Sequence, residues 1–236
     1  MFLPAALFGL VILNGFVLSS QGWAAAQPIT QELSTLSVDN VLSNEESVNP
    51  YHFYTFRQDY RKCLAPLCGG IFVKSVNKKV THCPDGSVQT ECYVALVLSK
   101  PKIELSSARL LQGTLLSKSF THFSALPVMR LKQAYRSTSS ALSAGVFVML
   151  KDNGIRCVTT PCFATDSYYL NKHKVRAVSA FDLSAVGAAE DLLTQALTAY
   201  GQSAFIVASG KYQVAQPPQN EDVTFIAQQF YLPISP

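Results

Sequence analysis

The sequence predicts an α+β fold: two related modules of mainly antiparallel sheet, each with a packed helix, joined into one compact unit. Three observations lead to this prediction. Short segments rich in β-branched and aromatic residues recur along the chain, and each is bounded by turn-forming residues. One segment has the apolar spacing of an amphipathic helix, and one pattern of cysteine and asparagine spacing occurs twice.

The chain begins with an apolar segment that has the pattern of a secretory signal. Residues 2–18 are almost all apolar, and small residues ending in Ala24-Ala25-Ala26 follow them. We therefore expect residues 1–26 to be a cleaved signal peptide and the mature protein to be secreted or periplasmic. The alternative is an uncleaved membrane anchor, for which the run is slightly short. No second long apolar segment follows, so we expect no membrane span after cleavage.

A polar stretch separates this segment from the modules. Residues 27–50 lack apolar periodicity, so we expect a mobile lead-in, followed by a first module at 51–130 and a second at 131–236 that ends in a strand. The chain has 19 Lys and Arg residues and 15 Asp and Glu residues, a net charge of +4. The basic residues do not form the arrangement of a nucleic-acid stacking platform, which argues against a nucleic-acid partner.

Nine short segments are expected to be strands, because they are β-branched or aromatic and are bounded by Gly, Pro, Asn or Asp. They are residues 52–57, 70–76, 93–98, 128–136, 145–150, 167–170, 174–181, 203–207 and 223–232.

One helix is expected at residues 188–200, where apolar side chains recur on one face. Ser184 is a candidate N-cap, and Gly201 follows the last apolar position. Residues 106–116 are its weaker counterpart in the first module, interrupted by Gly113. This pair of segments supplies the one packed helix expected in each module.

The cysteine spacing indicates an internal duplication. In residues 63–78 and again in residues 157–172, two cysteines five positions apart are followed nine positions later by an Asn-Lys pair. Asp59 and Asp152 precede the two cysteine pairs, each with a cation nearby. Agreement at this many positions indicates two copies of one module. Asn77 and Asn171 suit turns with positive φ, and the aspartates suit turns in which a carboxylate accepts backbone N–H groups.

The six cysteines are an even number behind a secretory signal, which is typical of a disulfide set. The second copy has two cysteines, so these pair with each other unless bonds cross between copies, and the first copy follows by analogy. A zinc site is less favoured, because the eight residues between Cys83 and Cys92 exceed the tight spacing of a zinc knuckle. The expected pairs are Cys63–Cys68, Cys83–Cys92 and Cys157–Cys162, with Cys83 and Cys92 closing a hairpin found in the first copy alone.

Three stretches carry a resemblance to a known family. Residues 154–162 followed by Asn171, residues 61–77, and residues 92–95 resemble a bacterial family of secreted proteins that carry a domain of unknown function. The resemblance covers roughly residues 51–214. It implies export and a paired-module architecture, and it implies no activity.

Common catalytic signatures are absent from the sequence. We find no Gly-x-Ser-x-Gly elbow, phosphate-cradling loop or His-Glu-x-x-His string, and the four histidines do not recur between the copies. We therefore predict no catalytic residue, no metal and no cofactor. His122 is expected to be a partly buried structural residue.

The resulting functional hypothesis is a secreted binding module, without enzymatic activity, that presents its cross-linked loops to an unknown protein or envelope ligand. A protease inhibitor is one concrete form of it. The alternative is a secreted hydrolase with an unrecognised active site. The candidate binding residues are Leu64, Ala65, Pro66 and Leu67 in the first loop and Val158, Thr159, Thr160 and Pro161 in the second.

Overall fold

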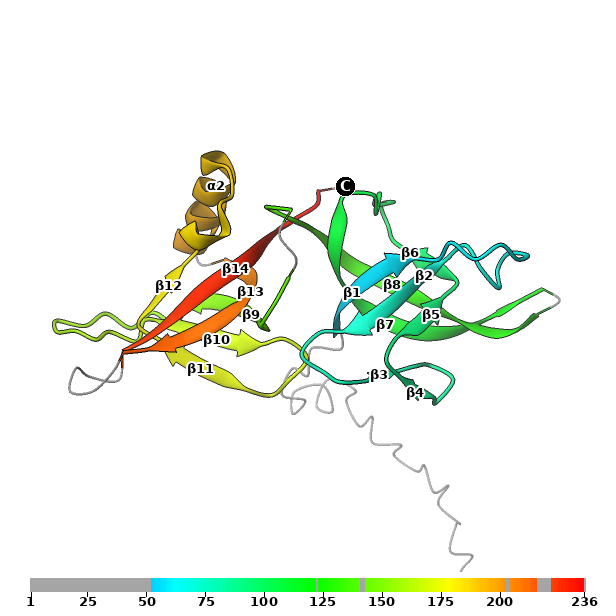
Figure 1. Ribbon diagram of the computed structural model, residues 1–236, viewed down its shortest axis with the longest axis horizontal. Coiled ribbons are helices and arrows are strands. Elements are labelled where there is room, and N and C mark those ends of the chain that lie inside the picture. Colours follow the sequence, from blue (N-terminus) through cyan, green and yellow to red (C-terminus); the bar gives the residue numbers. More distant parts are fainter. Residues whose placement is uncertain (1–51, 122, 141–142, 203, 216–221, 236) are drawn as a thin grey trace, which may run out of the picture. The chain divides into compact units, whose positions relative to one another are not determined.

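The computed structural model describes residues 52–121, 123–140, 143–202, 204–215 and 222–235 (Figure 1). The expected signal peptide, the lead-in and His122 lie outside these ranges. Within them, no helix is long and apolar enough to cross a membrane.

The first half of the described chain consists of strands and connecting loops. In chain order the strands are β1 (His52–Gln58), β2 (Ile71–Ser75), β3 (Thr81–His82), β4 (Val88–Gln89), β5 (Cys92–Val94), β6 (Leu96–Leu98), β7 (Ala108–Phe120) and β8 (Phe123–Ser137). Five of them form an antiparallel sheet in the order β5-β2-β1-β7-β8, and β6 pairs with β8 in parallel. The short β3–β4 hairpin stands apart from this sheet.

The second half has the same pairing pattern. Its elements are β9 (Val146–Asp152), β10 (Thr165–Tyr169), β11 (Val175–Val178), β12 (Ala180–Asp182), the 3-10 helix η1 (Ser184–Val186), α2 (Glu190–Gly201), β13 (Phe205–Val214) and β14 (Val223–Pro233). The order is β11-β10-β9-β13-β14, with β12 parallel to β14. An antiparallel contact between β14 and β8 joins both halves into one sheet of 12 strands.

The two halves correspond residue by residue in register. Tyr54 faces Ser75 across β1 and β2, as Val148 faces Tyr169 across β9 and β10. Each long hairpin has an irregularity at a glycine, Gly113 in the first half and Gly210 in the second. A Cβ atom would lie 2.5 Å from a backbone oxygen at Gly113 and 2.1 Å from one at Gly210, so close strand approach requires glycine at both places.

Two of the three apolar clusters lie within one half each, and the third is shared. In the shared cluster every member has a counterpart at the equivalent position of the other half, and each buried side chain contributes roughly 1.5–3 kcal/mol. The pairs are Phe53 with Phe147, Val76 with Leu170, Leu110 with Val207, and Tyr135 with Tyr231. This cluster therefore packs the two halves against each other.

Asn77 and Asn171 add a reciprocal polar contact between the halves. Both have φ of 59°, as expected for turn positions. The Asn77 amide donates to the Phe147 carbonyl at 2.6 Å and accepts from the Phe147 N–H at 2.8 Å. Asn171 makes the same two bonds with Phe53, at 2.7 and 2.8 Å. The asparagine of each half thus provides hydrogen-bond partners for the backbone N–H and C=O of one residue in the first strand of the other half.

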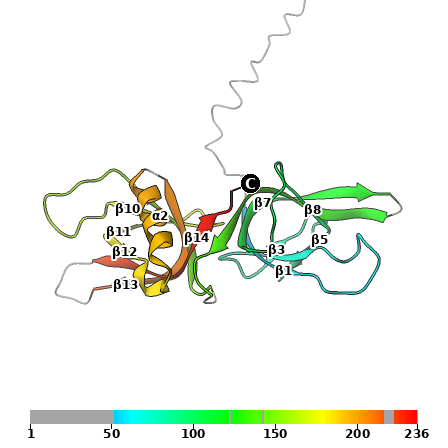
Figure 2. The ribbon, with the colours of Figure 1, turned by 90° about the horizontal axis from the view of Figure 1, so that it is seen from above.

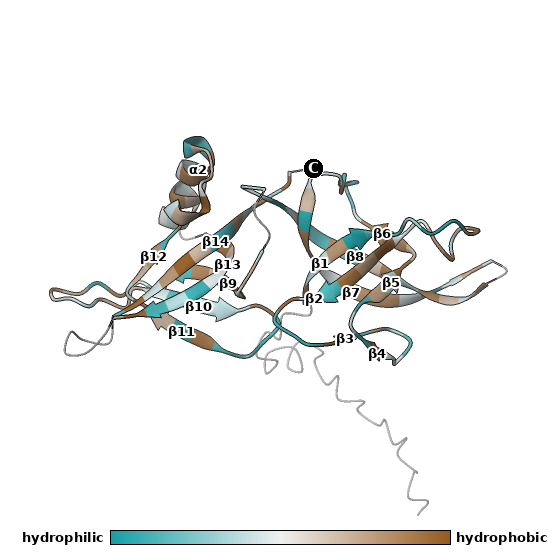
Figure 3. Ribbon diagram, in the orientation of Figure 1, coloured by the Kyte–Doolittle hydropathy of each residue, from teal (hydrophilic) through white to brown (hydrophobic). Residues whose placement is uncertain are grey.

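The expected α+β class is wrong, because the described chain is mostly antiparallel sheet with a single α-helix. Residues 106–116, expected to be helical, lie mainly in β7, where pairing with β1 and β8 on both sides determines their conformation. The second half has α2 against its sheet, where it contacts β9 and β13. Figure 2 shows α2 beside the strands of this half, and Figure 3 shows that α2 carries both hydrophilic and hydrophobic residues.

The start of α2 also differs from the expectation. Its N-cap is Ala189, whereas Ser184 begins η1 and hydrogen-bonds to the Asp182 carboxylate. Gly187, in the left-handed conformation, ends η1 and separates it from α2. Ser184 therefore caps no part of α2.

Candidate functional site

The two cysteine loops connect equivalent strands. The first cysteine loop, residues 59–70, joins β1 to β2, and the second cysteine loop, residues 153–164, joins β9 to β10. They project from opposite ends of the described unit (Figure 1). Disulfides close them with Cα–Cα distances of 5.7 Å and 5.6 Å. With Cys83–Cys92, these bonds join the pairs that the sequence predicts.

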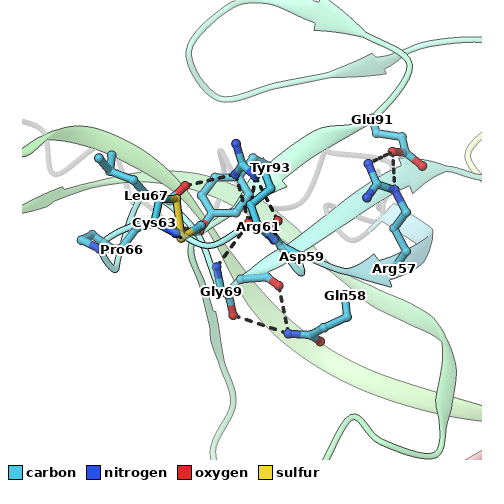
Figure 4. Close-up of polar contacts among 12 residues, drawn as sticks. Arg57, Gln58, Asp59, Arg61, Cys63, Pro66, Leu67, Gly69, Glu91 and Tyr93 are labelled. Carbon is cyan, nitrogen blue, oxygen red and sulfur yellow. Dashed lines mark hydrogen bonds and ion pairs between the residues drawn. A yellow bond between two sulfur atoms is a disulfide. The ribbon is translucent and has the colours of Figure 1, made fainter.

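The Asp59 side chain organises the base of the first cysteine loop. Its side chain is 1% exposed, and its carboxylate accepts from the backbone N–H groups of Arg61 (3.0 Å) and Gly69 (3.2 Å). The Arg61 guanidinium donates both to this carboxylate and to the Leu67 carbonyl, at 3.0 and 3.1 Å (Figure 4). The charged hydrogen bond from Arg61 lowers the pKa of Asp59, which keeps the carboxylate ionised.

Aromatic side chains support the same loop from β2 and β5. The guanidinium carbon of Arg61 lies 5.1 Å from the ring centroid of Phe72 and 5.0 Å from that of Tyr93, within cation–π range. Arg57 lies over the Phe72 ring at 4.1 Å. The Tyr93 hydroxyl donates to the Pro66 carbonyl at 2.8 Å, near the tip of the loop (Figure 4). The loop is therefore held by side chains as well as by its disulfide.

The second cysteine loop is held by a different set of side chains. The Asp152 carboxylate accepts from the Gly154 N–H at 2.8 Å and forms an ion pair with Arg156 at 2.6 Å. The Arg156 hydrogen bonds lower the pKa of Asp152 to about 2. The Asn153 amide donates to the Phe163 carbonyl at 2.9 Å, across the base of the loop.

The carboxylates of the two loops do not occupy equivalent positions. The Asp59 N–H donates to the Gly70 carbonyl at 3.0 Å, and its counterpart in the second half is the Asn153 N–H, which donates to the Ala164 carbonyl at 3.0 Å. Asp152 therefore lies one position earlier than the counterpart of Asp59. As expected, both carboxylates accept backbone N–H groups, which is a structural role.

The tips of both loops expose apolar side chains. Leu64 is 73% exposed, and Val158, at the equivalent position, is fully exposed at 103%. Among the candidate binding residues, Leu64, Ala65, Leu67, Val158, Thr159 and Thr160 are exposed, and Pro66 and Pro161 are half-buried. The arrangement can present an ordered apolar tip to a partner, and it places no acid–base pair at either tip.

The remaining polar candidates are dispersed. His52 and His82 lie in the first half and His173 in the second, and no group of three His, Cys, Asp or Glu residues within the described ranges could hold a metal ion. The sequence interpretation missed the contact between halves made by Asn77 and Asn171. The matching Asn-Lys spacing was a signal for it, but the spacing does not identify partners far away in the chain.

Comparison with known proteins gives a family and no activity. Neither the curated proteins nor the solved structures include a significant match to the chain. Residues 52–236, which include both halves and all three disulfides, match DUF6748, a domain of unknown function. The chain therefore belongs to the DUF6748 family.

Proposed function

We propose that the chain is an exported, disulfide-stabilised binding module that recognises a protein or envelope ligand through the tips of its two cysteine loops. The single observation that carries this proposal is the combination of a firmly held loop base with an exposed apolar tip. The first cysteine loop has its base tied by the buried Asp59 carboxylate, whereas Leu64 at its tip is exposed.

Export is supported by two features. The apolar segment at residues 1–26 has the composition of a cleaved signal peptide. Three disulfides in one domain are typical of an oxidising compartment, such as the periplasm or the extracellular medium.

Energetics favour binding through such tips. A leucine or valine transferred from water into a partner surface contributes roughly 1.5–3 kcal/mol. Ordering a loop at the moment of binding opposes association, and a loop that is already cross-linked and hydrogen-bonded avoids part of this cost. Leu64 and Val158 are therefore placed to contribute most of their burial energy to affinity.

The paired loops also fit an origin by duplication. We infer two modules, which the sequence predicts at residues 51–130 and 131–236. That boundary would fall inside β8, and β8 pairs with β7 along its length, so we place the junction after β8. The repeated strand order supports this inference, as do the shared bulge glycines and the matched pairs of the central cluster. Two loops at opposite ends suit a bivalent ligand or two separate partners.

The test is partner capture that depends on the loop tips. The oxidised protein is returned to envelope or culture-medium extracts of its source, alongside Leu64→Ser and Val158→Ser variants. Leu197→Ser, at an exposed apolar position of α2, is the matched control. We expect a partner captured by the wild type and the control, with capture reduced in a tip variant. A partner captured equally by all four proteins contradicts the assignment to the tips.

A panel of protease, esterase and glycosidase substrates separates binding from catalysis. Turnover by the wild type that a single substitution abolishes would favour the alternative of a secreted hydrolase. Inhibition of a protease in the same panel, relieved by Leu64→Ser or Val158→Ser, would identify the inhibitor form of the binding module.

A further inference from the structure

The first half contains a polar cavity that is distinct from the cysteine loops. Its volume is about 400 Å³, and it lies where β1, β2 and β7 meet the β3–β4 hairpin. The polar side chains that line it are His52, Tyr54, Ser75, Lys78, His82 and Thr114. The Cys83–Cys92 disulfide ties the hairpin to β5, and Cys83 itself belongs to the cavity wall.

A second hollow of about 430 Å³ shares Ser75 and Lys78 with the first, but its Thr55 and Lys74 alternate along β1 and β2 with Tyr54 and Ser75, so their side chains lie on the opposite face of the sheet. Lys74 and Lys79 line this second hollow, whereas Lys78 is the lysine that lines the cavity of Tyr54 and Ser75. No Asp or Glu lines either hollow, and none of the three lysines forms an ion pair with a residue in the described part of the chain. We call the first cavity the cleft; its wall carries the Lys78 ammonium and no carboxylate.

Two largely buried residues present hydroxyl groups to the cavity beside Lys78. Tyr54 is 4% exposed and Ser75 is 8% exposed. Neither hydroxyl hydrogen-bonds to a residue that the structure describes, and neither oxygen is fully enclosed, since within the described ranges the one fully buried and unpaired side-chain polar atom is the Ser209 hydroxyl oxygen. Burial raises the pKa of Tyr54 to about 12, so its hydroxyl keeps its proton and remains a donor. Two donors are thus available to a ligand that brings acceptors.

The other half of the protein shows that the fold does not require this polar set. By register, Val146 and Val148 stand where the first half has His52 and Tyr54, and Tyr169 stands in place of Ser75. The second half also lacks the hairpin, since β11 follows β10 after a short turn. The first half therefore departs from its counterpart by adding the Tyr54 and Ser75 hydroxyls and the hairpin wall, whereas Lys78 has a counterpart in Lys172.

We propose that this cleft binds a phosphoryl group, carried either by a small soluble metabolite or by a lipid headgroup. Lysine and neutral hydroxyl donors surround a space large enough for a ligand of sugar-phosphate size. A phosphoryl dianion is attracted to the Lys78 ammonium more strongly than a monocarboxylate is, and charge-assisted hydrogen bonds are stronger than neutral ones. Tyr54 and Ser75 supply donors from the floor, and Lys78 supplies charge from the rim.

Isothermal titration calorimetry of the oxidised full chain at constant ionic strength tests the proposal. The soluble probes are inorganic phosphate and glucose 6-phosphate, with acetate as the monocarboxylate comparison. The lipid probes are vesicles of phosphatidylcholine with and without phosphatidic acid, assayed by co-sedimentation. The variants are Lys78→Gln and Tyr54→Phe, and Lys118→Gln on β7 is a control for general loss of positive charge.

We expect saturable binding of a phosphate probe in preference to acetate, weakened about tenfold by Lys78→Gln and by less in Tyr54→Phe. Lys118→Gln should bind as the wild type does. Binding of the soluble probes identifies a metabolite site, whereas sedimentation with phosphatidic acid alone, lost in Lys78→Gln, identifies a headgroup site. Lys78 is exposed, so its replacement keeps the test usable if Tyr54→Phe is unstable.

Three results overturn the proposal: no saturable binding of any phosphate probe by the wild type, equal binding by wild type and Lys78→Gln, or an equal loss in Lys118→Gln. The outcome is independent of the proposed loop function, because Leu64→Ser and Val158→Ser leave the cleft intact. Phosphate binding without loop-dependent capture of a partner would contradict the proposed loop function alone. Loop-dependent capture without phosphate binding would contradict the phosphate site alone.

Discussion

Removing the Asn77 side chain should destabilise the protein through the contact between its halves. The amide makes three hydrogen bonds, to the Phe147 carbonyl (2.6 Å), the Leu170 carbonyl (2.9 Å) and the Phe147 N–H (2.8 Å). Each contributes about 1 kcal/mol net, so Asn77→Gly should lower the free energy of unfolding by about 3 kcal/mol. Asn77→Ala should cost about 1 kcal/mol more, because φ is 59° and alanine is strained there.

Urea unfolding followed by far-UV circular dichroism, with the disulfides intact, measures these changes. Asn171→Gly serves as the counterpart and should lose a similar amount, because Asn171 makes three equivalent bonds to the first half. Lys79→Ala, an exposed position close to Asn77, is the control and should stay within about 0.5 kcal/mol of the wild type. An Asn77→Gly protein as stable as the control would refute the role of this contact, as would a large effect at one asparagine alone.

Three further predictions concern the loops and the sheet. Replacing Cys157 and Cys162 by serine should lower the free energy of unfolding by about 2 kcal/mol in a denaturant titration and leave the fold intact, since the loop is short. The Asp152 ion pair should contribute stability fully above about pH 4 and lose it as the pH falls toward about 2, because the folded pKa is depressed from 3.8. A carboxyl NMR titration checks this, and Arg156→Gln should move the pKa back toward 3.8. Gly210→Ala should destabilise by at least about 1–3 kcal/mol in thermal unfolding, because the new Cβ atom would lie 2.1 Å from a backbone oxygen.

Features that depend on neighbours in sequence were predictable. The strand expected at residues 52–57 is β1, and that expected at residues 223–232 is β14. Both are rich in β-branched and aromatic side chains, which pack well on a pleated surface. The disulfide pairs were predictable for a similar reason, because cysteines five positions apart within one copy leave few alternatives once the copies are aligned.

Residues 106–116 show where this reasoning failed. Leu110, Leu111 and Leu115 have a spacing that suits a helix face as well as a strand with a bulge. Pairing with β1 on one side and β8 on the other makes the segment a strand, and those partners are distant in sequence. Gly113, which sequence reasoning took as a break in a helix, is the bulge position that closely approaches β8.

The asparagine contacts illustrate the same limit. The spacing of Asn77 predicts a turn, and its φ of 59° agrees. Its partner Phe147 lies 70 residues away, and no local pattern specifies a hydrogen bond at that separation. The matching Asn-Lys spacing could have suggested the contact, because a residue that occurs at the same place in both halves, yet is not needed by a strand, is a candidate for joining the halves.

Comparison of the halves therefore helps to separate residues that the fold requires from residues that are candidates for function. Features that occur twice, such as the closed loop bases and the central cluster, are sufficiently explained by the fold. Features that differ have no such explanation. The loop tips carry Leu64 in one half and Val158 in the other, so they share a framework and present different surfaces. The hydroxyl donors of the cleft, Tyr54 and Ser75, have Val148 and Tyr169 at the equivalent places of the second half, so a ligand there would bind a site that the two halves do not share.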